Sequence, residues 1–195
     1  MDPLATLDDL KAYGIDYDDD QLAQRLLESV SASIRDAAGS PISWGEWTFT
    51  IPSEQSRKLD LPIRPVHQVA TVLVDGQPVE DWRLFGNALY RPRPWGAYGQ
   101  IPVPVTITCT AGYKPIPEDI VRLACSYVAA GLHQQAEGGP GANKGVAYRR
   151  IDDYQIGYVQ TDTADQVDVM ELTPATRRSL RARFGTPAIG IGVFR

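Results

Sequence analysis

The chain has 195 residues, of which 43% are hydrophobic and 22% charged, so it is long enough to form one domain with a proper hydrophobic core. Its formal net charge of −5 argues against a protein that coats DNA, and no stretch approaches the roughly 20 apolar residues that span a bilayer. Residues 1–10 have neither the basic nor the apolar region of a signal peptide. We therefore expect a soluble protein made and kept in a cytoplasm.

The charges are distributed unevenly along the chain. Residues 1–20 contain seven aspartates against the single base Lys11, whereas residues 172–195 contain five arginines and no acid. One end is therefore acidic and the other basic. The two cysteines, Cys109 and Cys125, are too few for a disulfide framework, and we expect both to be small buried residues.

Residues 6–39 predict two helices. Thr6 is a capping residue for the first, which Gly14 ends, and the acidic turn that follows can cap the second. Apolar residues then recur at spacings of three and four until Gly39, which ends the second helix. These apolar residues are Leu22, Leu26, Leu27, Val30, Ile34 and Ala37.

From residue 44 to about residue 110 the apolar period changes to two, which predicts a β-rich insertion. Asp75-Gly76 is the strongest hairpin signal, because both central positions of a type I′ turn need a positive φ. Gly86-Asn87 predicts the next turn. Prolines mark strand starts and edges in this region, since proline cannot donate to a strand ladder.

Two further helices are predicted, over residues 117–135 and 174–184. The first is apolar on nearly every face, which is typical of a helix central to a core or a subunit interface. Between them, residues 136–145 form a glycine-rich loop, and strand-like alternation resumes around Asp152-Asp153. Thr173-Pro174 is a helix start and Gly185 a stop.

These elements define an α+β fold: a small helical bundle with a β-rich insertion, at about residues 44–110, between the second and third helices. We expect residues 1–185 to form one domain and residues 186–195 to form an extended C-terminal docking tail. In that tail Ile189, Ile191 and Val193 alternate with glycines, so an extended tail presents one apolar edge suited to strand addition, with Phe194 on the other side. We expect the tail to be disordered in the free subunit.

No group of residues in the sequence supports catalysis or metal binding, and no cofactor is expected. Asp16-x-Asp18-x-Asp20 begins like a calcium-binding loop, but the sixth position is not glycine, which favours a helix-capping turn. His67 and His133 lack metal-ligand spacing, and Cys125 lies on an apolar helix face where a thiol is inert. Asp152 and Asp153 are adjacent, so on a strand they would point to opposite faces.

The helix at residues 174–184 carries most of the basic charge near the C-terminus. Arg177, Arg178, Arg181 and Arg183 surround the apolar pair Leu180 and Phe184. Such a face allows contact with nucleic-acid phosphate or with an acidic protein surface. A plain solvated face remains an equal alternative.

The order of elements resembles the head-to-tail connector adaptors of tailed bacteriophages, also called head completion proteins. The segments that carry the resemblance are TLDDLKAYGI, LAQRLLESVSASIRDAAG, LDLPIRPVHQVATVLVDGQPVEDWRL, TCTAGYKPIPEDIVRLACSYVA, DDYQIGYV and LTPATRRSLRARFG. The β-rich insertion and the glycine-rich loop exceed the most compact helical members of the family.

The resemblance implies a non-enzymatic virion protein, assembled in the bacterial host cytoplasm, that forms a ring of about a dozen copies around the DNA channel. Its partners would be the portal protein on one side and a stopper or tail-completion protein on the other, with no membrane involved. The portal or a neighbouring subunit would be bound by residues of the last helix and tail: Arg177, Arg178, Arg181, Ile189, Ile191, Val193 and Phe194. The alternatives are a stopper or tail-completion protein, or a DNA-binding accessory protein that uses the arginine helix.

Overall fold

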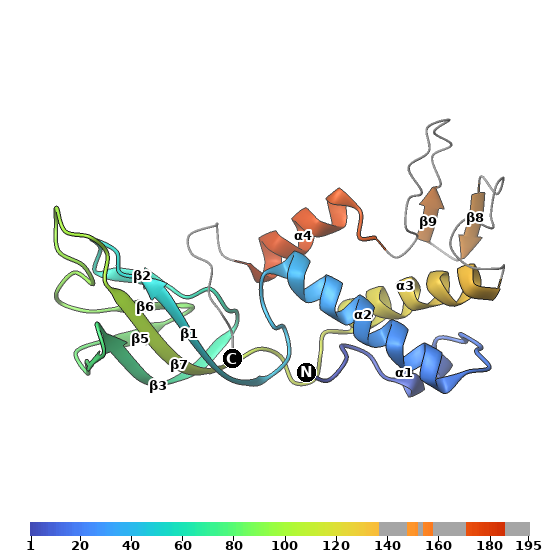
Figure 1. Cartoon of the computed structure of the whole chain (residues 1–195), viewed down its shortest axis with the longest axis horizontal. Helices are drawn as coiled ribbons and strands as arrows, with labels where there is room; N and C mark the ends of the chain where they lie inside the picture. Colours follow the sequence, from blue (N-terminus) through green and yellow to red (C-terminus); the bar gives the residue numbers. More distant parts are fainter. Residues whose placement is uncertain (137–147, 152–153, 158–170, 186–195) are drawn as a thin grey trace. The chain divides into compact units, whose positions relative to one another are not determined.

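A computed structural model describes residues 1–136, 148–151, 154–157 and 171–185 (Figure 1). This part of the chain contains four helices and nine strands, and every strand pair is antiparallel. The predicted α+β class is confirmed.

The described residues fall into two compact units. One unit draws on residues 1–31 and 119–171, and the other on residues 32–118 and 172–195. The division passes through the second helix, which is continuous across it. The expectation of a single domain over residues 1–185 stays a prediction.

The first unit begins with α1 (Leu7–Ala12), whose start is capped as predicted. The Thr6 hydroxyl accepts the backbone N–H of Asp9 at 3.2 Å, and the Asp9 carboxylate accepts the backbone N–H of Thr6 at 2.7 Å. This reciprocal pair is a capping box, which satisfies two backbone donors that a helix start would otherwise leave unpaired. The helix is short because Gly14, at φ 67°, turns the chain away.

The second helix, α2 (Asp20–Ala38), starts at the acidic turn and ends at Gly39, as predicted. Asp19 Oδ1 accepts the backbone N–H groups of Gln21 at 2.8 Å and Leu22 at 3.2 Å, so Asp19 is the capping residue. One side of the helix is buried. The buried residues are Ala23, Leu26, Leu27, Val30, Ser31, Ile34, Ala37 and Ala38.

The long helix α3 (Glu118–Ala136) follows the strands and returns to the first unit. Its burial is concentrated on one side, although its apolar residues continue around the helix, and Leu123 and Tyr127 are half-buried. The buried residues are Ile120, Val121, Ala124, Cys125, Val128 and Gly131. The finer prediction that the helices form a bundle stays a prediction.

The second unit contains the predicted β-rich insertion. Its larger sheet has the strand order β1 (Gly45–Pro52), β7 (Pro104–Ala111), β3 (Val66–Val74) and β4 (Gln77–Pro78). The pairing of β1 with β7 is regular from Gly45 opposite Ala111 to Pro52 opposite Pro104, while β3 pairs with β7 through two register shifts. Side chains on β1 alternate between a buried and an exposed face, which is why the sequence shows a period of two.

A smaller sheet has the order β2 (Lys58–Asp60), β6 (Ala88–Tyr90) and β5 (Arg83–Phe85). Its buried residues and those of the larger sheet form one hydrophobic cluster. Both predicted hairpin turns are confirmed: Asp75-Gly76 joins β3 to β4 with φ values of 51° and 75°, and Gly86-Asn87 joins β5 to β6. The cluster is made of Trp47, Phe49, Ile51, Leu59, Leu61, Ile63, Val66, Val69, Val72, Leu89, Trp95, Val105, Ile107, Cys109 and Ala111.

Two elements complete the described chain. The hairpin of β8 (Tyr148–Ile151) and β9 (Tyr154–Gly157) occupies the segment where strand alternation was predicted. Asp152 and Asp153 between these strands lie outside the described residues. The last helix, α4 (Pro174–Phe184), has the predicted bounds, with Thr173 as its N-cap and Gly185 after its end.

Candidate functional site

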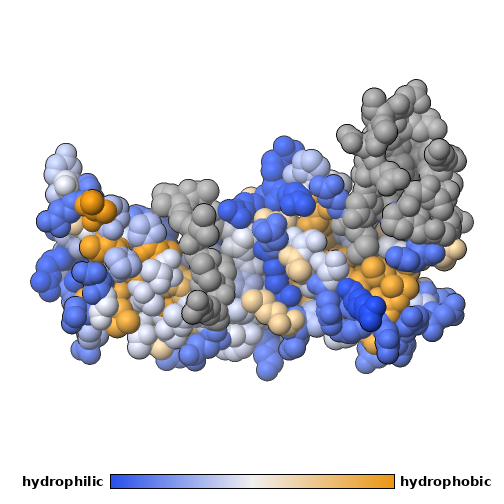
Figure 2. Space-filling view, in the orientation of Figure 1, coloured by the Kyte–Doolittle hydropathy of each residue, from blue (hydrophilic) through white to orange (hydrophobic). Residues whose placement is uncertain are grey.

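The structure gives α4 two different sides. Leu180 and Phe184, one turn apart, are buried, and the Phe184 ring meets the Tyr113 ring edge-on at a centroid distance of 5.9 Å. The rest of the helix is hydrophilic on the face seen in Figure 2. The predicted apolar pair therefore anchors α4.

Arg177 and Arg181 are placed against the C-terminal end of α2. The Arg177 Nε–H donates to the Leu172 carbonyl at 3.2 Å, and its Nη1 lies 3.9 Å from the Asp36 carboxylate. The guanidinium of Arg181 lies where a β-carbon on Gly39 would be. A cation at the end of a helix also interacts favourably with the helix dipole. These two arginines thus have a role within the chain as well as an outward charge.

Arg178 differs from both. It is exposed, and no hydrogen bond or ion pair of its side chain is formed among the described residues. Arg183 lies on the other side of α4, with its guanidinium 4.8 Å from the Phe184 ring centre. At positions i, i+1 and i+4, Arg177, Arg178 and Arg181 share one side of the helix, which we call the arginine face.

The end of α4 approaches α2 very closely. A β-carbon on Gly185 would lie 2.8 Å from the Ala38 carbonyl oxygen and 2.7 Å from that of Arg181. Because both are backbone atoms, no side chain can be accommodated there without movement. The helix-stop glycine that the sequence predicted therefore also sets the distance between the two helices.

The other residues expected to bind a portal or a neighbour are Ile189, Ile191, Val193 and Phe194. They lie outside the described residues, as does the rest of the tail at residues 186–195. The predicted docking tail stays a prediction.

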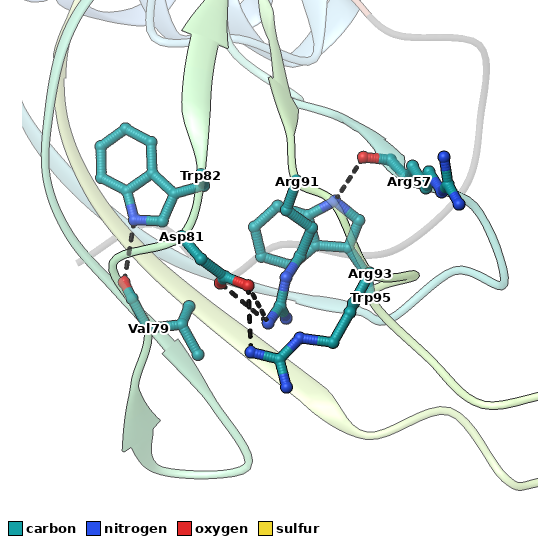
Figure 3. A network of polar contacts seen from close by, with 7 residues as sticks. All are labelled: Arg57, Val79, Asp81, Trp82, Arg91, Arg93 and Trp95. Atoms are coloured by element: carbon teal, nitrogen blue, oxygen red, sulfur yellow. Dashed lines mark hydrogen bonds and ion pairs between the residues drawn. The ribbon is translucent and has the colours of Figure 1, made fainter.

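A second polar cluster, in the β-rich unit, was not predicted from the sequence (Figure 3). Asp81 forms ion pairs with Arg91 at 2.9 Å and with Arg93 at 3.3 Å. Partial burial acts to raise the pKa of Asp81, but the hydrogen bonds and charges of Arg91 and Arg93 outweigh it and hold that pKa below its usual value. The Asp81 carboxylate is therefore ionised at neutral pH and ties the chain after β6 to the chain before β5.

Trp95 fixes the segment after β6 through a second set of contacts. Its ring is buried, its indole N–H donates to the Arg57 carbonyl at 3.2 Å, and the Arg91 guanidinium lies 5.1 Å from the ring centre (Figure 3). The Arg91 side chain is only 10% exposed, so the Asp81 carboxylate compensates a charge that has lost most of its water. This cluster is structural in character.

Beside this cluster is an open depression of about 480 Å³ lined by Glu80, Asp81, Trp82, Arg83, Tyr90, Arg91 and Pro92. Nearby on the β5–β6 hairpin, Phe85 is 78% exposed and meets the Tyr90 ring edge-on at 6.3 Å. The sequence has no local signal for this surface, since Asp81 is separated from Arg91 and Arg93 by ten and twelve residues.

The residues weighed for catalysis are placed as follows. Cys125 and Cys109 are buried and not joined in a disulfide, as predicted, and burial raises the pKa of Cys109 to about 11, so it is not ionised at neutral pH. The His67 Nε2 lies 2.8 Å from the Gly112 carbonyl oxygen. The centres of the His67 and Trp44 rings are 4.5 Å apart. Within the described ranges, no three His, Cys, Asp or Glu side chains gather where they could hold a metal ion.

The described helices include none with the length and apolar character needed to cross a membrane. Neither a protein-family model nor a curated protein matches the chain.

Solved structures similar to the chain include the following two. One is described as "Virion of native gene transfer agent (GTA) particle", with a TM-score of 0.48 and 16% identity, and the match covers 89% of this chain and 81% of that one. The other is described as "Neck of empty GTA particle computed with C6 symmetry", with a TM-score of 0.46 and 16% identity, covering 89% and 83%. Likenesses at this level do not by themselves assign a function.

Proposed function

We propose that this chain is a structural virion protein, a head-to-tail adaptor that forms a ring between the portal and the stopper or tail around the DNA channel. The observation that supports it is the order of elements. Two capped helices, a β-rich insertion, a long helix with a buried side, a β-hairpin and an arginine helix follow one another in the chain. This is the order of the segments in which the sequence resembles the connector adaptor family.

The charge distribution also suits such a role. A subunit of a closed ring meets its two neighbours through different surfaces, so opposite charges on those surfaces favour one orientation and speed encounter. The acidic residues of this chain gather at residues 1–20, and its arginines gather on α4. We propose that Arg177, Arg178 and Arg181 contact the portal or a neighbouring subunit, and that Ile189, Ile191, Val193 and Phe194 add a docking strand.

The test is to locate the chain in the particle. Deleting its gene should yield heads that package DNA but carry no tails, and a tagged copy should be found by electron microscopy at the junction of head and tail. A tagged chain that is absent from purified particles, or a deletion strain with a normal yield of tailed particles, would show that the proposal is wrong.

A stopper or tail-completion protein would occupy a neighbouring position in the same junction. The two roles differ in the order of binding, because an adaptor binds the portal directly whereas a stopper needs the adaptor first. Purified chain mixed with isolated portal should therefore co-sediment with it. Binding only to a portal that already carries another protein would favour the stopper.

A DNA-binding accessory role draws on the same arginines. Against it, α4 divides its arginines between two sides, and Arg177 and Arg181 are turned toward α2. Each phosphate contact makes binding fall steeply with salt, so a DNA-binding protein should lose affinity for a duplex by orders of magnitude between about 50 and 200 mM salt. Measured portal binding should change far less over this range.

A further inference from the structure

The acidic turn between α1 and α2 carries several exposed carboxylates. Asp16, Asp18, Asp19 and Asp20 are all exposed, but only Asp19 caps α2. Asp16, Asp18 and Asp20 form no ion pair among the described residues. We call these three residues the acidic turn. Like charges held this close repel one another, so the turn is a strong attractor for cations.

The arginine face of α4 is the complementary surface. Its helix contains no acid, and Arg178 stands exposed without an ion partner in the described chain. The Asp36 carboxylate lies beside this face, 3.9 Å from Arg177, and is 84% exposed. Guanidinium groups suit carboxylates because their planar fork donates two parallel hydrogen bonds.

We propose that the arginine face binds the acidic turn of a second copy of this chain, so that copies join head to tail. This inference rests on the proposed function, since a contact between two different surfaces closes into a ring when the rotation between copies permits it. Charge complementarity selects the occupant: the turn offers three exposed carboxylates without an ion partner in the described chain, and the arginine face offers the exposed guanidinium of Arg178 beside the positive charges of Arg177 and Arg181. Exposed ion pairs are individually weak, so the contact is weak in one pair and strengthened by repetition around the ring.

The test reverses charge on each surface in separate full-length proteins. The first variant carries Arg178→Glu and Ala182→Glu, which leaves Arg177 and Arg181 on their contacts within the chain. The second carries Asp16→Lys and Asp18→Lys, which leaves the Asp19 cap intact. All four positions are exposed, so both variants should fold, with a melting temperature lowered only by the small cost of these charges near helix ends. The control protein carries Arg83→Glu and Glu80→Lys, an exposed pair in the β-rich unit.

Self-association is measured by sedimentation equilibrium at about 20 mM salt, where charges act over more than about 10 Å. Each variant alone should associate at least about tenfold more weakly than wild type, because one of its two surfaces no longer carries a net charge opposite to the other. An equal mixture of the two variants should recover to within about threefold of wild type. One contact between unlike copies joins the two unaltered surfaces, and in the other the introduced glutamates face the introduced lysines. The control should match wild type.

Weak contacts are captured by disulfide trapping. A chain with Gln21→Cys beside the acidic turn and Ala182→Cys beside the arginine face should give a ladder of covalent multimers on oxidation, because a head-to-tail contact continues from copy to copy. Both native thiols are buried and should not contribute. The first charge variant, built with Ser179→Cys in place of the cysteine at 182, should lose the ladder.

A mixture no tighter than either variant alone, or a missing ladder, would overturn the inference. The inference would also be overturned if the Arg178 variant lost binding to a DNA duplex while its ladder was unchanged. The arginines would then bind DNA phosphate groups. The proposed function is judged separately by location in the particle. A chain found at the junction without charge-dependent association would keep that function and lose this contact.

Discussion

The guanidinium of Arg181 on α4 lies in the space left by the missing side chain of Gly39, the residue that ends α2. Gly39 has a φ of 63°, a conformation that favours glycine, so one residue both ends the helix and makes room for the next. The contact joins two positions far apart in the sequence. It explains why the arginine face is held on the end of α2.

Replacing Gly39 with alanine should destabilise the protein by about 1–3 kcal/mol. About 1–2 kcal/mol comes from the positive φ. The new β-carbon also displaces the Arg181 guanidinium, which adds only a small cost because this group is the end of a flexible side chain. The matched control is Gly14→Ala, since Gly14 has a φ of 67° but no atom near its β-carbon position. In urea unfolding, Gly14→Ala should lower the free energy of unfolding only by the amount that the positive φ costs. In a double-mutant cycle with Arg181→Ala, the Gly39→Ala cost should fall toward that of Gly14→Ala. Equal costs in both backgrounds would show that Arg181 is not the obstacle.

Cys125→Asp should unfold the protein or leave it insoluble. The Cys125 side chain is 1% exposed on the buried side of α3, so a carboxylate there must be protonated or disrupt its neighbours. The cost of several kcal/mol is a large part of the ~5–15 kcal/mol that stabilises a typical domain. Gln135→Asp on the same helix is exposed and serves as the control. A soluble Cys125→Asp variant with an unchanged melting temperature would place this side of α3 on the surface.

Asp81→Asn should lower the melting temperature and change its pH dependence. The folded pKa of Asp81 lies below its unfolded value of about 3.9, so its charge contributes stability above that value and loses it as pH falls through the folded pKa. The gap between wild type and variant should be full at pH 5–7 and shrink in acid. The control, Asp60→Asn, removes a surface partner of Lys58 and should cost less. A gap that is constant from about pH 7 to pH 2.5 would contradict a role for the charge.

The purified chain should be a monomer or weak oligomer at micromolar concentration. Its net charge of −5 keeps copies apart until a template raises their local concentration. Sedimentation velocity measures this directly, with and without isolated portal. A closed ring that forms without portal would refute the expectation.

Truncation after Gly185 should leave the described fold intact and prevent the chain from co-purifying with portal-containing heads. A tail with alternating Ile189, Ile191 and Val193 suits strand addition, in which backbone hydrogen bonds supply affinity. Placing aspartate at these three positions should act like the truncation, whereas serine at Gly190 and Gly192 should have a smaller effect. A normal infectious yield from the truncated chain would show that residues 186–195 are not needed for assembly.

Local signals predicted those features that neighbouring residues decide. The Thr6 and Thr173-Pro174 helix starts, and the Asp75-Gly76 turn, appear in the structure where the sequence placed them, because a cap or tight turn is settled within three or four residues. The burial of Leu180 and Phe184 follows in the same way from their spacing of one helical turn.

Tertiary structure alone decided which distant segments meet. The pairing of β1 with β7 joins residues about 60 positions apart, as in the Thr48–Thr108 contact. The alternation of apolar residues in a strand predicts which face of that strand is buried, but not which strand it pairs with. The Asp81 cluster and the Arg181–Gly39 contact likewise have no local pattern, because ion pairs and close approaches depend on where folded backbones come together. The arginines of α4 show the difference. The sequence determined that α4 is basic. Only the packing of α4 against α2 determined that Arg177 and Arg181 contact the end of α2 while Arg178 stays exposed.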